Sequence, residues 1–175
     1  MSELAQMIAA AEAGHCILLL TTPKSEKRIG PLARALRDAL PPPTAAERRA
    51  IEMVYADQDM GYTGLPRPLR APHHTVSAAA MTGSPRNPRF MGELALAHAG
   101  VLLLAELPSF MPYVVSEIAR VLAEGRSGKY PAVPAVIVAS CPLKMAKTCL
   151  ASERSAVCST QWTAIHVRVM KDTWP

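Results

Sequence analysis

The stretch Gly92–Phe110, GELALAHAGVLLLAELPSF, decides the fold of this chain. Within it, Val101–Leu104 is apolar at every position, and a strand that is apolar on both faces is typical of the interior of a parallel sheet. The run ends at Ala105 and Glu106. An apolar strand that ends in an acidic residue is typical of the active edge of a nucleotide-hydrolysing sheet, so this stretch predicts both a fold and the position of a site.

The rest of the chain alternates apolar runs with amphipathic segments. Further strands are predicted at 16–20, 133–140 and 164–169, and helices at the N-terminus, 29–40, 44–55 and 112–124. The helix after Thr44 has the spacing of a capping box with Glu47. Leu69–Thr75 is expected to be extended, Ser77–Met81 to form a helical turn, and Glu93–Leu96 to be one arm of a hairpin. We therefore predict a three-layer α/β sandwich around a mainly parallel, five-stranded sheet.

Composition limits the class of protein. The chain has 175 residues, half of them hydrophobic and 19% charged, which excludes a disordered protein and predicts one domain over 1–175. No secretory signal and no apolar run long enough to cross a bilayer are present, so we expect a cytoplasmic protein without a membrane partner. The formal net charge of +5 is compatible with solvated surface charge or with an anionic partner such as nucleic acid. The nearest approach to a basic patch is formed by Arg67, Arg70, Arg86 and Arg89.

The four cysteines, at positions 16, 141, 149 and 158, have no C-x-x-C pair and no zinc-ligand spacing. Cys16 and Cys141 lie in or beside predicted buried strands, where a thiol behaves as a small hydrophobic group. We expect structural thiols and no metal site.

Four blocks of the sequence carry a family resemblance. They are GHCILLL at 14–20, LPRPLRAPHHTVSAAAMTG at 65–83, GELALAHAGVLLLAELPSF at 92–110 and IVASCP at 137–142. With these blocks in this order, the chain resembles the magnesium-chelatase-like AAA+ ATPases, in the competence-related (ComM) branch. The resemblance implies a P-loop NTPase-like core, with ATP and Mg²⁺ as the cofactors of the family.

The phosphate-binding loop of that family, G-x-P-G-S-G-K-T, aligns with Thr21–Arg28, TTPKSEKR. Lys27 falls on the family's lysine, whereas the three glycines are replaced by Thr21, Lys24 and Glu26, and the magnesium-binding hydroxyl by Arg28. A phosphate loop needs the close approach that glycine permits, and Glu26 places a negative charge where phosphates would lie. The resemblance gives candidate nucleotide-binding residues Lys24, Ser25, Lys27 and Arg28, and these substitutions predict that tight ATP binding is lost.

The other catalytic motifs of the family are altered as well. Its strand-end Asp-Glu pair is Ala105 and Glu106 here, so Glu106 is the remaining candidate catalytic residue, as a remnant without its metal-binding neighbour. The family's sensor asparagine aligns with Cys141, and its Asp-Arg pair before the last strand aligns with Gln161 and Trp162. The sequence ends at Pro175, directly after that strand, which predicts that the helical lid is absent.

His73 and His74 belong to the family's APHHT block. Neighbouring side chains of an extended segment point to opposite faces, so the pair is expected to serve packing and hydrogen bonding and not to chelate one ion.

Three functions follow as hypotheses. The first is a non-hydrolysing AAA+-like module that binds a protein partner, either an intact AAA+ relative or another copy of itself. The second is a weak ATPase that uses Lys27 and Glu106 and is completed by a partner subunit. The third is a DNA-associated accessory protein related to competence or recombination, whose affinity would fall steeply with salt.

Overall fold

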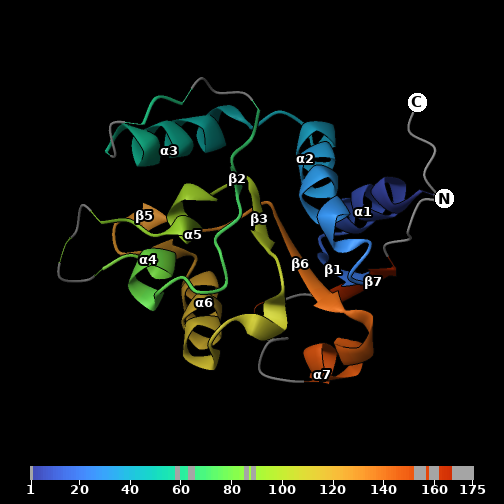
Figure 1. The fold of residues 1–175 in the computed structure, drawn as a ribbon. Helices are drawn as coiled ribbons and strands as arrows, with labels where there is room; N and C mark the ends of the chain where they lie inside the picture. The colour runs from blue at the N-terminus through green and yellow to red at the C-terminus, as the bar shows by residue number, and fades with distance from the viewer. Residues whose placement is uncertain are drawn as a thin grey trace.

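A single parallel sheet organises the molecule in the computed structural model, which describes residues 2–57, 60–62, 66–84, 87, 90–151, 157 and 162–166 (Figure 1). The strands lie in the order β2-β3-β6-β1-β7, and every pairing between them is parallel. Their bounds are β1 Cys16–Thr21, β2 Leu69–Arg70, β3 Val101–Leu104, β6 Val136–Pro142 and β7 Trp162–His166. The predicted five-stranded parallel sheet is confirmed.

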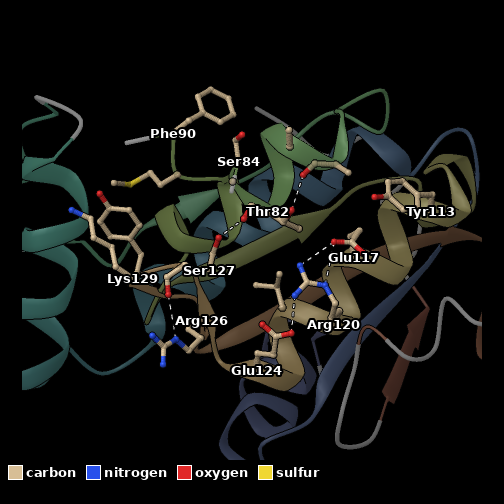
Figure 2. A pocket seen from close by; sticks show the side chains of 17 residues that line it. Thr82, Ser84, Phe90, Tyr113, Glu117, Arg120, Glu124, Arg126, Ser127 and Lys129 are labelled. Atoms are coloured by element: carbon tan, nitrogen blue, oxygen red, sulfur yellow. Dashed lines mark hydrogen bonds and ion pairs between the residues drawn. The ribbon is translucent and has the colours of Figure 1, made fainter. Parts of the chain in front are cut away.

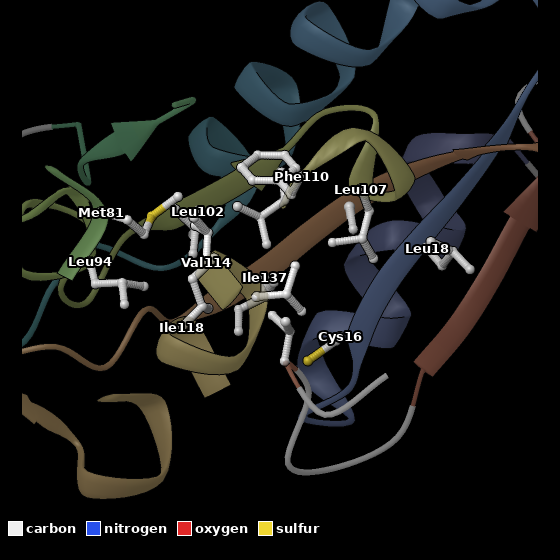
Figure 3. Packing of buried hydrophobic residues seen from close by; sticks show 14 of the residues in the cluster. Cys16, Leu18, Met81, Leu94, Leu102, Leu107, Phe110, Val114, Ile118 and Ile137 are labelled. Carbon is white, nitrogen blue, oxygen red and sulfur yellow. The ribbon is translucent and has the colours of Figure 1, made fainter. Parts of the chain in front are cut away.

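Helices cover both faces of the sheet, which is why its central strands bury apolar side chains on both faces. Alternate residues such as Ile17 and Leu19 pack against α1 (Glu3–Glu12) and α2 (Ile29–Ala39). Their neighbours, such as Leu18, pack on the other face. Figure 3 shows that second cluster, in which Met81 of α4 (Ala78–Thr82) and Ile118 of α6 (Pro112–Glu124) meet strand side chains. The three-layer α/β sandwich is therefore present.

The predicted helix boundaries follow local chemistry. The α3 helix (Ala45–Ala56) begins with the capping box, in which the Glu47 N–H donates to Thr44 Oγ1 at 3.2 Å and the Thr44 N–H donates to Glu47 Oε2 at 2.7 Å. The α6 helix ends at Gly125, whose φ of 68° is the left-handed conformation that glycine adopts without strain.

Gly92 and Gly100 allow two sequence blocks of the family resemblance to pack closely against each other. A Cβ on Gly100 would lie 2.1 Å from the Pro68 carbonyl oxygen, and a Cβ on Gly92 would lie 2.3 Å from the Met81 carbonyl oxygen. The Val101 N–H donates to the same Pro68 carbonyl at 2.8 Å. The 92–110 block therefore packs backbone to backbone against the 65–83 block, at a distance that no larger residue permits.

The two arginines of the nearest approach to a basic patch that the structure describes are both paired with carboxylates. Arg67 is only 8% exposed and its guanidinium contacts the Glu47 carboxylate at 3.1 Å and the carbonyls of Pro41 and Ala99. Arg70 is paired with Glu93 at 2.6 Å. These charges are neutralised inside the fold and leave no patch. Arg86 and Arg89 lie outside the described residues.

Several elements differ from the sequence-based prediction. Glu93–Leu96 is a short helix, α5, and not a hairpin arm, because Leu94, Ala95 and Leu96 are all buried and a helix can bury side chains on every side. The β6 strand begins at Val136, since Val133 is half exposed. A hairpin of β4 (Arg126–Ser127) and β5 (Tyr130–Pro131), and the helix α7 (Ala146–Ala151), were not predicted.

The expectation of free thiols is also wrong. Cys141, at the end of β6, forms a disulfide with Cys149 of α7, and Cys16 is disulfide-bonded as well. Cys16, Cys141 and Cys149 are all buried, as expected for strand and helix cysteines. The sequence could not show that α7 folds back onto β6. Among the described residues, no helix combines the length and the apolar character needed to cross a membrane.

Candidate functional site at the carboxyl edge of the sheet

The predicted site residues converge at one edge because parallel strands all end on the same side of a sheet, the side where open α/β sheets bind ligands. The order β3-β6-β1 makes the ends of these three strands neighbours. The segment Thr22–Arg28, which we call the β1 loop, follows β1, and Ala105 and Glu106 follow β3. Cys141 and Pro142 are the last two residues of β6.

The β1 loop is closed by the side chain of Ser25, which is completely buried. Its hydroxyl accepts from the Thr22 N–H at 2.9 Å and donates to the Thr22 carbonyl at 3.2 Å. That carbonyl also accepts from the N–H groups of Ser25 at 2.9 Å and Glu26 at 3.1 Å, and the Arg28 N–H donates to the Ser25 carbonyl at 3.0 Å. These four backbone donors are satisfied within the loop, whereas a phosphate cradle needs its donors directed at the ligand.

The backbone conformation of the β1 loop also differs from that of a glycine-rich phosphate loop. None of its residues has a positive φ, and the loop ends in a 3-10 turn, η1 (Glu26–Arg28), that runs directly into α2. A loop with this backbone conformation does not require glycine.

The cationic side chains of the loop do not converge on a common point. Lys24 and Lys27 are exposed to solvent. Arg28 donates from Nη1 to Glu3 Oε1 of α1 at 3.0 Å, so the residue that replaces the magnesium-binding hydroxyl is held by the first helix. Of the four candidate nucleotide-binding residues, Ser25 points into the loop, Arg28 to α1, and the two lysines to solvent.

Glu106 has an unusual backbone and carboxylate environment. Its φ of 55° and ψ of 51° place it in the left-handed region, which is strained for a residue with a side chain. Its N–H donates to Ser140 Oγ of β6 at 2.8 Å, and its Oε2 lies 3.3 Å from His74 Nδ1. Ser140 is 1% exposed and was missed in the sequence, although a serine within the apolar run IVASCP was an available signal.

A second carboxyl, that of Glu26, belongs to the β1 loop. Burial, and then a hydrogen bond and the charge of Glu106, raise the pKa of Glu26 above its ordinary value. The Glu26 carboxyl therefore has an increased tendency to hold a proton.

The histidine pair departs from the expectation of opposite faces. The rings of His73 and His74 lie together with centroids 4.1 Å apart, because the segment turns at His74 and Thr75 instead of remaining extended. His73 Nδ1 is 2.8 Å from Thr75 Oγ1, and His74 contacts the ring of Phe110 edge-on at 6.4 Å. The pair forms hydrogen bonds and ring contacts as predicted, and His74 also reaches Glu106.

The sensor position offers no donor to a ligand. The sulfur of Cys141 is in the disulfide with Cys149, and its carbonyl accepts from Thr21 Oγ1 at 3.4 Å. Trp162 is the first residue of β7 itself and does not precede that strand, and Gln161 lies outside the described residues.

ATP and Mg²⁺ do not fit the residues present. The loop amides are satisfied, the loop interior is filled by Ser25, and carboxyls stand where phosphate charge would come. The described part of the chain also contains no cluster of three or more His, Cys, Asp or Glu side chains arranged to hold a metal ion.

A separate hollow of about 630 Å³ lies away from this edge. Figure 2 shows its walls, which come from α4 and the segment after it, from α6, and from the β4–β5 hairpin. Phe90 and Tyr113 contribute exposed aromatic rings, whereas Arg120 is paired with Glu117 at 3.0 Å and Glu124 at 2.7 Å. No side chain of the β1 loop or of Glu106 lines this hollow.

Comparison with solved structures agrees with this architecture. NtrX from Brucella abortus in complex with ATP superposes with a TM-score of 0.58 at 16% identity, covering 95% of this chain and 34% of that one. The complex of the same protein with ADP gives the same TM-score at 14% identity, covering 94% of this chain and 34% of that one. At this identity the likeness concerns the fold.

Sequence relatives are closer. YifB from Salmonella typhimurium is 39% identical over 103 residues, which are 57% of this chain and 20% of that protein. Competence protein ComM from Haemophilus influenzae is 34% identical over 119 residues, 66% of this chain and 23% of that protein. The chain thus spans about a fifth of the length of these relatives. The family model of magnesium chelatase subunit ChlI matches residues 2–170, so the chain belongs to the magnesium-chelatase-like family of AAA+ proteins.

Proposed function

We propose that this chain is a degenerate AAA+ module that does not hydrolyse ATP and that acts by binding a protein partner. The observation that carries the proposal is the closed β1 loop, in which the buried Ser25 hydroxyl bonds both the N–H and the carbonyl of Thr22. A nucleotide would have to displace these bonds before it met any backbone donor. The partner is either an intact AAA+ relative or a second copy of this chain.

Electrostatic repulsion disfavours nucleotide binding, as the loop geometry does. A phosphate placed near Glu26 and Glu106 would meet carboxyls instead of a bound cation. A like-charge contact of about 4 Å costs about 4 kcal/mol near a protein surface. Lys27 is exposed and does not offset this repulsion from its position in the structure.

The packing of the fold supports a scaffold role. The strands retain apolar side chains on both faces, and Gly92 and Gly100 retain the close backbone contacts of the family blocks. The substitutions are concentrated at the carboxyl edge, where they affect the phosphate loop, the metal-binding acid and the sensor. A protein that is kept for its shape tolerates this distribution of changes, because no ligand at that edge contributes to its stability.

Nucleotide titration and a hydrolysis assay test the first part of the proposal. We expect no calorimetric binding of Mg-ATP at micromolar concentrations and no turnover above that of the Lys27→Ala variant. A restored variant carrying Thr21→Gly, Lys24→Gly, Glu26→Gly, Arg28→Thr and Ala105→Asp is the matched control, and it is expected to gain affinity. Micromolar binding by the natural chain, with turnover lost in Lys27→Ala, would overturn the proposal.

The partner is tested by light scattering after size exclusion, with the chain alone and mixed with an intact AAA+ relative. A discrete complex of either kind supports the proposal, and a strictly monomeric chain in both samples contradicts it. If turnover appears only in the mixture and is lost in Glu106→Gln, the chain is instead a partner-completed ATPase.

A DNA-associated role is a second candidate, motivated by the formal net charge of +5 and by the similarity to a protein named for competence. Phosphate contacts make affinity fall steeply as salt rises. A gel shift at low salt that disappears with added salt would favour this role, whereas the absence of any shift would exclude it. Because Arg67 and Arg70 are paired internally, we expect weak binding at most.

A further inference from the structure

The hollow between α4, α6 and the β4–β5 hairpin combines exposed aromatic rings with an arginine side chain. Phe90 is 45% exposed and Tyr113 is 66% exposed, and both line the hollow (Figure 2). Arg126 lines it from β4. We infer that this hollow is the docking site for a segment of the protein partner that carries an apolar or aromatic side chain next to a carboxylate. The inference rests on the proposed function, since it assigns a surface to the partner binding proposed there.

The walls of the hollow are fixed to the rest of the fold. In the hairpin, Ser127 Oγ donates to the Thr82 carbonyl of α4, and a Cβ on Gly83 would lie 2.9 Å from the same Oγ. Tyr130, also in the hairpin, is 2% exposed and belongs with Met91 to a buried cluster. A site that is already formed loses less conformational entropy on binding, which favours affinity.

The apolar surface of the hollow is suited to an inserted side chain. Ala78 and Ala79 of α4 and Val121 of α6 line it with small side chains, which leaves a volume of about 630 Å³. Phe90 and Tyr113 expose much of their rings to water, and burial of such apolar surface favours association. Aromatic residues and arginine are also the side chains that most often dominate the binding energy of protein interfaces.

The charges that line the hollow favour one carboxylate, placed at the β4 side. Arg120 is held between two glutamates of its own helix, at 3.0 and 2.7 Å, and Lys129 is paired with Asp57 at 2.8 Å. Arg126 donates from Nε to the Gly128 carbonyl at 3.2 Å, and among the described residues no carboxylate pairs with it. Its other donors can therefore bind a carboxylate through parallel hydrogen bonds. Arg120 and its two glutamates carry one net negative charge, so a carboxylate is disfavoured along α6.

The open rim of the hollow favours a protein segment over a small molecule. Small-molecule sites enclose most of the surface of their ligand. The exposed rings of Phe90 and Tyr113 lie at a rim that is open to solvent, so a small ligand would leave them partly in water. A partner protein covers the rim together with the hollow and buries both rings.

Titration of the full, isotope-labelled chain with short probe peptides, followed by amide chemical shifts, tests the docking site. The probe is N-acetyl-Gly-Phe-Asp-Gly-amide, and the same peptide with Asn in place of Asp is the matched control for the carboxylate. We expect saturable shifts at the amides of Thr82, Ser127 and Gly128, which line the hollow. The Asp peptide should bind about threefold to fivefold more tightly than the Asn peptide, as expected for a partly exposed ion pair.

Four variants separate the charge from the apolar contact. Arg126→Met should bind the two peptides equally, whereas Arg49→Met, an equal charge change at an exposed position of α3, should keep the preference for Asp. Tyr113→Ala should weaken the binding of both peptides by about fivefold or more. Met111→Ala, which removes an exposed apolar side chain outside the hollow, should not weaken it. Absent shifts, shifts located outside the hollow, or a preference for Asp that survives in Arg126→Met would overturn the inference.

Light scattering of the same variants, mixed with the intact AAA+ relative, separates this inference from the proposed function. If Tyr113→Ala and Arg126→Met form the complex as well as the natural chain does, the docking site is wrong and partner binding stands. If the natural chain forms no complex with the relative or with itself, the proposed function fails. In that case the peptide titration still decides whether the hollow binds an aromatic side chain next to a carboxylate.

Discussion

The interior of the sheet and its carboxyl edge belong to the same strands, yet they are held by different kinds of contact. In the interior, Gly92 and Gly100 keep backbone contacts that admit no side chain, and the strands β1, β3 and β6 bury apolar side chains on both faces. At the edge, the β1 loop satisfies its own amides. The difference shows that close packing fixes the interior residues, whereas the edge is closed by hydrogen bonds within its own loop.

The largest effect is expected where the interior permits no change. Gly100→Ala would place a Cβ 2.1 Å from the Pro68 carbonyl oxygen, so the backbone of two family blocks must separate. We expect a loss of about 3 kcal/mol or more in the free energy of unfolding, measured by urea denaturation.

Gly30→Ala is the matched control for this change. A Cβ on Gly30 meets nothing within 4 Å, and Gly30 lies in α2. Alanine should stabilise the helix there, by up to about 1 kcal/mol. Equal effects of the two substitutions would show that the interior does not depend on the contact between Gly100 and Pro68.

The second largest loss of stability is expected on substitution of Arg67, which is buried. Arg67→Met removes the partner of Glu47 and leaves the carbonyls of Pro41 and Ala99 without a donor. Burial tends to raise the pKa of Glu47, but the hydrogen bonds from Arg67 and Thr44 outweigh it and lower the pKa. We expect a loss of about 3 kcal/mol at neutral pH.

This loss should become smaller as pH falls through the pKa of Glu47, because the ion pair contributes only while Glu47 is ionised. Arg120→Met is the control, since Arg120 is half exposed in its pairs with Glu117 and Glu124 and should cost less than about 1 kcal/mol. A cost for Arg67→Met as small as that of Arg120→Met would contradict the structural role given to Arg67.

A smaller effect is expected at the boundary between the two regions. Ser140→Ala removes the acceptor of the Glu106 N–H, at a side chain that is 1% exposed. We expect a cost of about 1–2 kcal/mol by chemical denaturation. Ser116→Ala, on the exposed face of α6, should change stability by less than about 0.5 kcal/mol. A neutral Ser140→Ala would mean that the strained backbone of Glu106 does not rely on β6.

The smallest expected effect is a change in pH dependence. Burial lowers the pKa of His98, and the Val133 N–H donates to its Nδ1 at 3.3 Å. The unfolded chain then binds more protons than the folded chain, so this contribution to stability is lost as pH falls below about 6.5. His98→Gln should reduce the acid-side slope of stability against pH, measured by thermal denaturation. An unchanged slope would show that His98 titrates as a solvated histidine.

Much of the interior could be predicted, because buried side chains recur in the sequence with the period of the helix or strand that carries them. The strand at Val101–Leu104, the capping box of Thr44 and Glu47, and the amphipathic helix 112–124 all follow from local spacing. The helix at Glu93–Leu96 could not be predicted, because its three buried residues have no period that separates helix from strand.

The candidate site, too, could be predicted only in part from the sequence. The sequence alone determined the sheet and the edge at which its strands end. Only the tertiary structure decided that Ser25 turns inward, that Arg28 reaches α1, that Cys141 pairs with Cys149, and that His74 reaches Glu106. The physical reason is that the direction of a loop side chain has no repeat in the sequence. It is set by contacts with residues far away along the chain, and those contacts exist only once the sheet has brought the strand ends together.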